Sequence, residues 1–337
     1  MNNLQNPLEN AAENKYNKIK LFLPVYTGIQ IFFGRGSSIM KKFWMAAAAV
    51  VLCAAMLLTV AATAFTFTAC NDDNDGDGKK PFESDLIGAY VPAMQPEDTQ
   101  GIYGDIFITP TWKDPENVPK VDLSAIFQQS VGIDFLLMMT SSMIPMMYAG
   151  GLDHFDFNND GTFAFGYREL EDFANMKFSE KVYTFPGSET QELIPAGAIT
   201  YYTQNGLLYF AVSKQFLTKI GQEKLNMDLT EIVNGMISTY HLENSIVSTN
   251  ELFAIPLKYS IDEAGVVTIK VDLAMMKPFL PLLTELLPLL PEEVEFDMMG
   301  TGTPSKIPAR KVVGELLDGL LNQTTALEIG IRLNKNA

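Results

Sequence analysis

The chain has few of the residue types that build recognisable chemical sites. Its 337 residues include two cysteines, Cys53 and Cys70, and two histidines, His154 and His241. A structural zinc site needs a cluster of Cys and His ligands, which so small and scattered a set does not supply. The sequence also lacks a Gly-x-Ser-x-Gly elbow and a glycine-rich phosphate loop of either common type. It therefore predicts no metal and no cofactor.

Basic residues are scarce as well. The chain carries 24 lysines and arginines against 40 aspartates and glutamates, which gives a formal net charge of −16. A nucleic-acid partner is excluded on this ground, because a phosphate backbone requires a positive protein surface. The same charge is repelled by anionic membrane surfaces, so attachment to a membrane needs a source of affinity other than electrostatic attraction.

That source is indicated by an apolar stretch that follows two lysines. Lys41 and Lys42 precede Met45 to Phe67, where the Cys53 thiol is the only ionisable group. A positive start, a long apolar run and small residues at its end are typical of a secretory signal peptide. The end of the run, Phe67-Thr68-Ala69-Cys70, resembles a bacterial lipobox. This resemblance implies cleavage before Cys70 and lipidation of its sulfur, so that the protein is held to a membrane by an N-terminal lipid anchor.

A transmembrane helix is the alternative interpretation of this stretch. About 20 apolar residues span a bilayer, and Met45 to Ala69 is long enough. Many of these residues are Ala and Thr, however, and the apolar sequence changes abruptly to Asn-Asp-Asp directly after Cys70. We interpret that junction as a cleavage and lipidation site. Removal of Met1 to Ala69, with its six basic and two acidic residues, lowers the formal charge from −16 to −20.

An acidic, glycine-containing segment follows Cys70. Asp73, Asp75 and Asp77 are spaced like the start of an EF-hand calcium loop, but the twelfth position, which holds a Glu in such loops, is Ser84. We interpret residues 70–84 as a solvated acidic tether. The segment also resembles the acidic export signal of surface lipoproteins in Bacteroidales-type bacteria. This resemblance implies the outer membrane and the cell surface, with the periplasmic face as the alternative.

These features divide the chain into four parts. Residues 1–39 lie upstream of a complete signal peptide, and we interpret them as a gene-prediction extension, with a translated but disordered extension as the alternative. Residues 40–69 are the predicted signal peptide and residues 70–84 the tether. Residues 85–337 form one predicted domain, which contains no cysteine. Its stability must therefore come from its hydrophobic core and not from disulfides.

Three predicted hairpins dominate this domain. In each of them two strands rich in aromatic and branched residues flank a turn with Asn, Asp and Gly, which supply the positive φ angles that tight turns need. The predicted strand pairs are Phe155–Phe157 with Thr162–Tyr167, Ile199–Thr203 with Leu207–Val212, and Leu257–Ile261 with Val266–Val271. Because apolar and polar residues alternate in these strands, one face of the sheet is expected to be buried.

Further strands and several helices complete the predicted fold. Strands are expected at Leu86–Tyr90, at Ile102–Thr109 and from Leu327 to Leu333. Helices are expected at Val121–Gly132, Ile133–Tyr148, Lys214–Tyr240, Leu273–Leu290 and Lys306–Asn322. The sequence thus predicts an α+β domain: a curved antiparallel meander sheet or partly closed barrel built from hairpins, with inserted apolar helices.

Two of these patterns carry a resemblance to a known family. The opening Leu86-Ile87-Gly88-Ala89-Tyr90 and the repeated order of strand, Asn/Asp-Gly turn and aromatic strand resemble the lipocalin-like domains of uncharacterised Bacteroidales lipoproteins. The resemblance implies a lipocalin-like barrel. Lipocalin barrels lack the long helical insertions of this chain, which argues against a simple eight-stranded barrel.

Two groups of methionines are candidate ligand contacts. Methionine is flexible and lines promiscuous apolar pockets as well as filling gaps in cores. The candidate pocket residues are Met138, Met139, Met143, Met146, Met147, Met275 and Met276. Prolines at 278, 281, 288 and 291 would divide the predicted helix Leu273–Leu290 into short helices, and such short helices suit a lid over a barrel mouth. Plain core packing is the alternative.

Carboxylates are the remaining candidates for chemistry. Glu169, Glu171 and Asp172 follow an aromatic strand and are the candidates for an acid pair that hydrolyses glycans or peptides, although a solvated charged turn explains them equally well. His154 is interpreted as a packed or surface residue, and no residue is assigned as catalytic. The leading hypothesis is a lipid-anchored, non-enzymatic protein of the cell envelope that binds an apolar ligand or a partner. The alternatives are a surface hydrolase and a structural component of an envelope complex.

Overall fold

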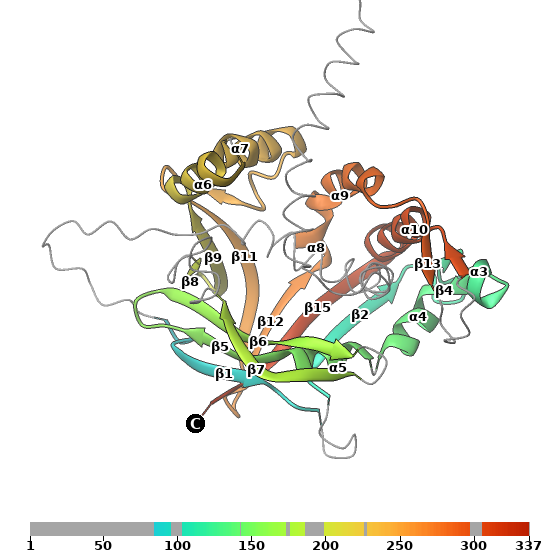
Figure 1. The fold of residues 1–337 in the computed structure, drawn as a ribbon, viewed down its shortest axis with the longest axis horizontal. Coiled ribbons are helices and arrows are strands. Elements are labelled where there is room, and N and C mark those ends of the chain that lie inside the picture. The colour runs from blue at the N-terminus through green and yellow to red at the C-terminus, as the bar shows by residue number, and fades with distance from the viewer. Residues whose placement is uncertain are drawn as a thin grey trace, which may run out of the picture.

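The computed structural model describes seven stretches of the chain: residues 84–95, 103–141, 143–172, 176–185, 199–225, 228–296 and 305–336. The predictions for residues 1–39, for the signal peptide, for Cys70 and for most of the tether lie outside the described residues. The described stretches form an α+β fold around one large antiparallel sheet (Figure 1).

Eight strands of this sheet form a closed antiparallel barrel. Their order is β1-β5-β6-β8-β9-β11-β12-β15, and β15 pairs with β1 to close the ring through Tyr90 and Lys335, Val91 and Asn334, and Pro92 and Leu333. The strands are β1 (Gly88–Pro92), β5 (Leu152–Phe157), β6 (Thr162–Asp172), β8 (Ile199–Gln204), β9 (Leu207–Ser213), β11 (Leu252–Ile261), β12 (Val267–Asp272) and β15 (Thr324–Lys335). The predicted fold class, a barrel-like antiparallel sheet with helices, is confirmed.

Additional strands extend the barrel. β2 (Ile106–Trp112) pairs with β15, β7 (Lys177–Phe185) with β6, and β10 (Val247–Ser248) with β11. β13 (Val294–Phe296) and β14 (Ser305–Ile307) form a separate two-stranded ribbon. Pro110 lies within β2, opposite Leu327. A proline is tolerated there because β2 is the last strand on this path of the sheet.

All three predicted hairpins are confirmed, as β5–β6, β8–β9 and β11–β12. Their turns contain the residues with positive φ that the sequence predicts. Gly161 has a φ of 83°, Asn205 and Gly206 have 53° and 73°, and Gly265 has 81°. Local turn chemistry therefore sets the register of these strand pairs.

The predicted helix at Val121–Gly132 is wrong. This segment forms β3 (Lys120–Val121), the short helix α3 (Ser124–Phe127) and β4 (Val131–Gly132). β3 and β4 pair with each other, and this pairing buries Val121 and Val131. Gln128 ends α3 with a φ of 59°. Tertiary burial of the two valines overrides the helical spacing of the apolar residues.

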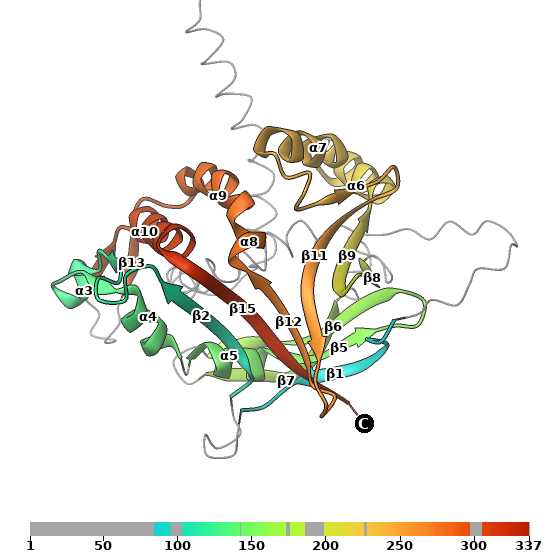
Figure 2. The ribbon, with the colours of Figure 1, turned by 180° about the vertical axis from the view of Figure 1, so that it is seen from behind.

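Strand pairing is short at two places in the barrel. β6 pairs with β8 only through Thr162 and Phe163, and from Phe165 onward β7 pairs with this edge of β6 instead. β11 pairs with β12 only from Lys258 to Ile261. We call these places the β6–β8 seam and the β11–β12 seam. Beyond them the strands diverge, so the barrel has a narrow end near the C-terminus and a wide end toward the helices (Figures 1 and 2).

The helices gather in groups toward the wide end. α6 (Lys214–Ile220) and α7 (Leu229–Tyr240) follow β9 and are linked by a π-helical turn, η2 (Gly221–Leu225). α8 (Leu273–Met276) and α9 (Leu280–Leu286) follow β12, with 3-10 turns at η3 (Lys277–Phe279) and η4 (Leu287–Leu289). The breaks match the predicted effect of the prolines, which have no N–H to donate to a continuous helix.

α10 (Ala309–Asn322) is the helix most deeply packed in the core. It leads into β15, and it buries eight residues: Ala309, Val312, Val313, Leu316, Leu317, Gly319, Leu320 and Leu321. Burying a leucine or valine side chain stabilises a fold by about 1.5–3 kcal/mol, so α10 contributes strongly to the stability of this side of the domain.

The remaining helices, α4 (Ile133–Thr140) and α5 (Met143–Gly151), precede β5. Within the described stretches no single helix has the length and apolar character to span a bilayer. α4 and α5 meet that test only when taken together, and a bend of 43° separates them.

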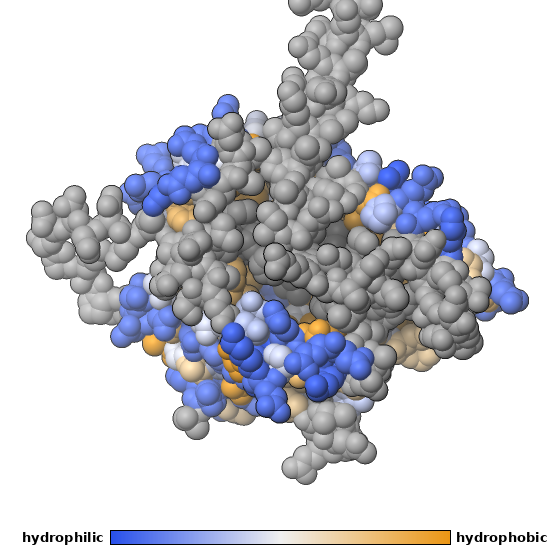
Figure 3. Space-filling model, in the orientation of Figure 1, coloured by the Kyte–Doolittle hydropathy of each residue, from blue (hydrophilic) through white to orange (hydrophobic). Residues whose placement is uncertain are grey.

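Ion pairs join neighbouring strands on the outer face of the barrel. Lys258 on β11 pairs with Asp272 on β12, Lys270 pairs with Glu328 on β15 at 2.7 Å, and Arg332 on β15 pairs with Asp105 at 2.7 Å. In the view of Figure 3 the described surface is mostly hydrophilic, with hydrophobic residues interspersed. Along each strand, residues on this outer face alternate with buried residues on the inner face, as the sequence predicts.

Gly330 on β15 is a position where the backbone has no room for a side chain. A Cβ atom there would lie 2.6 Å from Phe107 Cζ, 2.7 Å from the Ile269 carbonyl oxygen and 2.8 Å from Lys270 Cβ. We expect Gly330→Ala to lower the free energy of unfolding by about 1–3 kcal/mol, because the neighbouring strands must move apart. Urea unfolding of the full chain in detergent, followed by circular dichroism, measures this change.

Gly235→Ala is the matched control for this substitution. A Cβ at Gly235 has no atom within 4 Å, and the residue lies inside α7. Alanine is expected to stabilise this helix by about 0.5–1 kcal/mol relative to glycine. Equal effects of the two substitutions would contradict the close packing at Gly330.

Candidate functional site

The inner face of the barrel carries a continuous series of aromatic rings, which we call the aromatic ladder. These rings come from five barrel strands and from β7, which continues the sheet beside β6, and each one has a neighbouring ring with a centroid within 6.4 Å. The ladder consists of Tyr90, Phe155, Phe157, Phe163, Phe165, Tyr167, Tyr183, Phe185, Tyr201 and Phe210. They face inward because strand residues alternate between the two faces of a sheet.

Toward the narrow end of the barrel, the aromatic ladder is a closely packed core that solvent does not reach. Phe157 is 1% exposed, and its ring centroid lies 5.6 Å from that of Tyr90, 5.0 Å from Phe163 and 4.9 Å from Tyr201. The contacts with Tyr90 and Tyr201 are edge-to-face, which is a favourable geometry for aromatic rings. This region closes the barrel between β1, β5, β6 and β8.

Solvent reaches the ladder beyond the β6–β8 seam. Phe165, Tyr167 and Tyr183 are half-buried, although they continue the same inward-facing rows of β6 and β7. Phe165 contacts Phe185 at 5.2 Å, and Tyr167 stacks on Tyr183 at 5.5 Å. The ladder thus passes from a sealed core to partly exposed rings at the place where β6 changes its partner.

The polar atoms of the ladder are arranged to remain uncharged. The Tyr201 hydroxyl donates to the carbonyl oxygen of Asn158 at 3.0 Å. Burial is the main cause that raises the pKa of both Tyr201 and Tyr90 above the usual range of a phenol. Both hydroxyls therefore stay protonated at neutral pH, and the aromatic ladder presents a neutral, largely apolar surface.

A hydrogen bond joins two helix groups at the wide end. The hydroxyl of Tyr240 on α7 donates to Glu285 Oε2 on α9 at 2.6 Å. Burial, and then the hydrogen bond and charge of Glu285, raise the pKa of Tyr240. α7 belongs to the group that follows β9 and α9 to the group that follows β12, so this contact bridges the β11–β12 seam.

The predicted methionine residues lie on two separate parts of the barrel. Met138 and Met139 on α4 are 61% and 42% exposed, whereas Met276 on α8 is 2% exposed. Met143, Met146 and Met147 are half-buried on α5, and Met275 is half-buried on α8. α5 contacts β2, β5, β6 and β7, while α8 contacts β12 and β15. The structure thus places the methionines of α4 and α5 in one region and those of α8 in another. A ligand pocket shared by both groups stays a prediction.

The candidate carboxylates lie at the far end of the long strand β6. Glu169 and Glu171 are exposed, and Asp172 is half-buried. Glu171 forms an exposed ion pair with Lys177 across the β6–β7 pair, at 2.7 Å. The three residues lie inside β6, so the alternative interpretation, a charged turn, is wrong about the element, although Glu169 and Glu171 are solvated as it expected. Hydrolysis by these residues stays an untested prediction.

His154 lies on the outer face of β5, directly over Gly166 of β6. Its Nδ1 is 2.8 Å from Asp153 Oδ2, its Nε2 is 3.4 Å from Asp156 Oδ2, and Arg168 pairs with Asp153. This placement agrees with a packed or surface histidine whose ring nitrogens lie close to two carboxylates. His241 is exposed at the end of α7. The described part of the chain contains no group of three or more His, Cys, Asp or Glu residues that could hold a metal ion.

The sequence interpretation did not identify the aromatic ladder as a candidate site. The signal was present, because Phe155, Phe157, Phe163 and Phe165 alternate with other residues in the first predicted hairpin. β7, which supplies Tyr183 and Phe185, was not predicted as a strand. No known protein family, curated protein or solved structure matches this chain. The function is therefore inferred from the geometry of the chain itself.

Proposed function

We propose that this protein is a cell-envelope lipoprotein, anchored through lipid on Cys70, whose barrel binds an apolar ligand at its wide end. The observation that carries the proposal is the change of exposure along the aromatic ladder. Phe157 and Tyr201 are each 1% exposed, whereas Phe165, Tyr167 and Tyr183 are half-buried on the same inner face. An apolar surface that solvent reaches inside a barrel suits an apolar ligand.

The energy available from such binding is substantial. Full burial of a phenylalanine side chain stabilises by about 1.5–3 kcal/mol, and a ligand that covers several half-buried rings gains part of this for each ring. The narrow end and α10 already hold large buried clusters. Phe165 and Tyr183 at the wide end remain only half-buried, so a ligand that covers them would bury additional apolar surface.

Photo-crosslinking tests this proposal at the level of single residues. The full chain is purified in mild detergent, irradiated with a diazirine-labelled fatty acid, digested and analysed by mass spectrometry. We expect labelled peptides to contain Phe165 and Phe210, because Phe210 on β9 is half-buried like Phe165. Phe210→Ala is expected to reduce the labelled fraction about tenfold, which corresponds to about 1.4 kcal/mol of lost contact.

Tyr209→Ala is the matched control, because Tyr209 precedes Phe210 on β9 and faces outward. Its ring stacks on Tyr202 at 4.6 Å on the outside of the barrel. The control should retain the labelling of the parent protein. Equal labelling of inward-facing and outward-facing residues, or equal losses in the two variants, would contradict an apolar site inside the barrel.

A further inference from the structure

A second, polar pocket lies at the narrow end of the barrel, away from the wide end. Its volume is about 570 Å³, within the range of about 300–1,000 Å³ that small-molecule sites occupy. Three segments that are distant in the sequence form it: the chain entering β1, the β8–β9 turn and β11. The polar lining residues are Ser84, Asp85, Thr203, Gln204, Asn205 and Tyr259.

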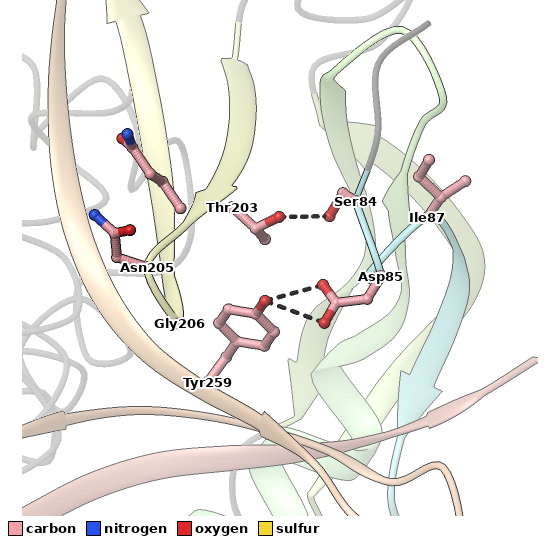
Figure 4. Close-up of a pocket in the computed structure, with 8 residues that line it drawn as sticks. Ser84, Asp85, Ile87, Thr203, Asn205, Gly206 and Tyr259 are labelled. Carbon is pink, nitrogen blue, oxygen red and sulfur yellow. Dashed lines mark hydrogen bonds between the residues drawn. The ribbon is translucent and has the colours of Figure 1, made fainter.

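Hydrogen bonds fix the polar groups on one side of this pocket. The Tyr259 hydroxyl donates to both carboxylate oxygens of Asp85, at 2.9 and 3.2 Å, and the Thr203 hydroxyl donates to Ser84 Oγ at 3.2 Å. Burial, and then Asp85, raise the pKa of Tyr259, so its hydroxyl remains a donor. Figure 4 shows Asn205 across the pocket from Ser84 and Asp85.

The polar lining residues are followed or preceded in the chain by buried core residues. Leu86, directly after Asp85, is fully buried, and Tyr201 and Leu257, two residues before Thr203 and Tyr259 on their strands, are 1% and 5% exposed. At the rim, a Cβ on Gly206 would have no atom within 4 Å, so the turn backbone faces open space. A ligand can therefore approach this backbone closely while the polar groups below it stay in place.

The lining chemistry selects among ligand classes. The lining residues that the structure describes supply one carboxylate, three hydroxyls and two amides, and none of these described residues is a lysine, arginine or histidine. Without a basic residue among them, the lining does not suit a phosphate or a carboxylate ligand. Hydroxyl groups on a ligand both donate and accept, and so do amides and hydroxyls of the lining, while the carboxylate accepts. This combination fits a neutral ligand with several hydroxyl groups.

We infer that this pocket binds a neutral carbohydrate unit, with Asp85 accepting from ligand hydroxyls and the Asn205 amide contacting the ligand from the opposite side. The Tyr259 hydroxyl holds the carboxylate in position for this contact. This site is separate from the aromatic ladder and does not depend on an apolar ligand there. It gives the protein a second binding function at the end of the barrel where the tether would join the domain.

Saturation-transfer difference NMR of the full chain in detergent tests this inference. The probes are glucose, galactose, mannose, N-acetylglucosamine and their common disaccharides, with inorganic phosphate as the charged probe. At least one saccharide should receive saturation from the protein, while phosphate should give no chemical-shift change in a parallel phosphorus spectrum. Asp85→Asn is expected to weaken saccharide binding about tenfold, because a hydrogen bond to a charged acceptor is lost.

Two further variants separate binding from folding. Asn205→Gly removes the amide but suits the φ of 53° at this position, and it should also weaken saccharide binding while the thermal midpoint stays unchanged. Glu263→Gln makes the same change of charge as Asp85→Asn at an exposed residue of the β11–β12 turn, and it should leave binding unchanged. The inference is overturned if no saccharide binds the parent protein or if phosphate binds with the same affinity as the saccharides. It is also overturned if the Asp85 and Asn205 variants bind saccharides as tightly as Glu263→Gln does.

Discussion

Replacing Cys70 by alanine is expected to abolish incorporation of labelled palmitate and to leave the precursor at its full length. The physical reason is that the proposed anchor is a covalent lipid on this sulfur. A domain with a formal charge of about −20 after processing gains no electrostatic attraction from anionic lipids, so loss of the acyl chains removes the main source of membrane affinity. Metabolic labelling in the host, with fractionation of the envelope, measures both effects.

Cys53→Ala is the matched control for this experiment. Cys53 lies within the same apolar run, and Val51 and Leu52 before it are bulkier than the residues that precede Cys70. Its replacement should leave labelling, cleavage and fractionation unchanged. The anchor proposal fails if neither the parent nor the Cys70 variant takes up palmitate and both remain unshortened in the envelope fraction. That outcome would indicate the alternative, an uncleaved transmembrane segment.

The parts of the fold that the sequence predicted are those governed by neighbouring residues. The β8–β9 hairpin is determined by Asn205 and Gly206, because few other residues adopt positive φ at low cost. The division of Leu273–Leu290 into short helices follows from prolines that lack an N–H. Such effects act within a few residues, so a single sequence displays them directly.

The parts that the sequence left open or predicted wrongly depend on distant residues. Closure of the barrel requires β1 to pair with β15, which places Tyr90 beside Lys335. β6 pairs first with β8 and then with β7, and this change of partner depends on how the three strands are arranged in space. No local pattern encodes either feature, and Val121 and Val131 show the same limit, because their pairing replaced a predicted helix.

The candidate sites were affected in the same way. The methionine groups can be recognised in the sequence because their members are close together along the chain. The aromatic ladder instead spans from Tyr90 to Phe210 in sequence. The first predicted hairpin shows part of it, but its full extent is seen only when six strands lie side by side. The polar pocket is harder still to predict, since Asp85, Asn205 and Tyr259 share no motif and meet only through barrel closure.

Phe157→Ala is expected to be the most destabilising single substitution in the aromatic ladder, lowering the free energy of unfolding by about 3–5 kcal/mol. Phe157 contacts Tyr90, Phe163, Tyr201 and Phe210, and it is 1% exposed. Truncation would leave a cavity among large rings that cannot collapse around it without moving the strands. Urea unfolding of the full chain in detergent, followed by circular dichroism, measures the loss.

Two comparisons make this prediction specific. Tyr209→Ala removes a ring of similar size from the outer face and should cost much less, because the cavity it leaves opens to solvent. Phe157→Leu keeps most of the buried volume and should recover more than half of the stability lost in Phe157→Ala. If Phe157→Ala costs no more than Tyr209→Ala, the narrow end is not a close-packed core. The contrast between a sealed and a solvent-accessible part of the aromatic ladder, on which the ligand proposal rests, would then be lost as well.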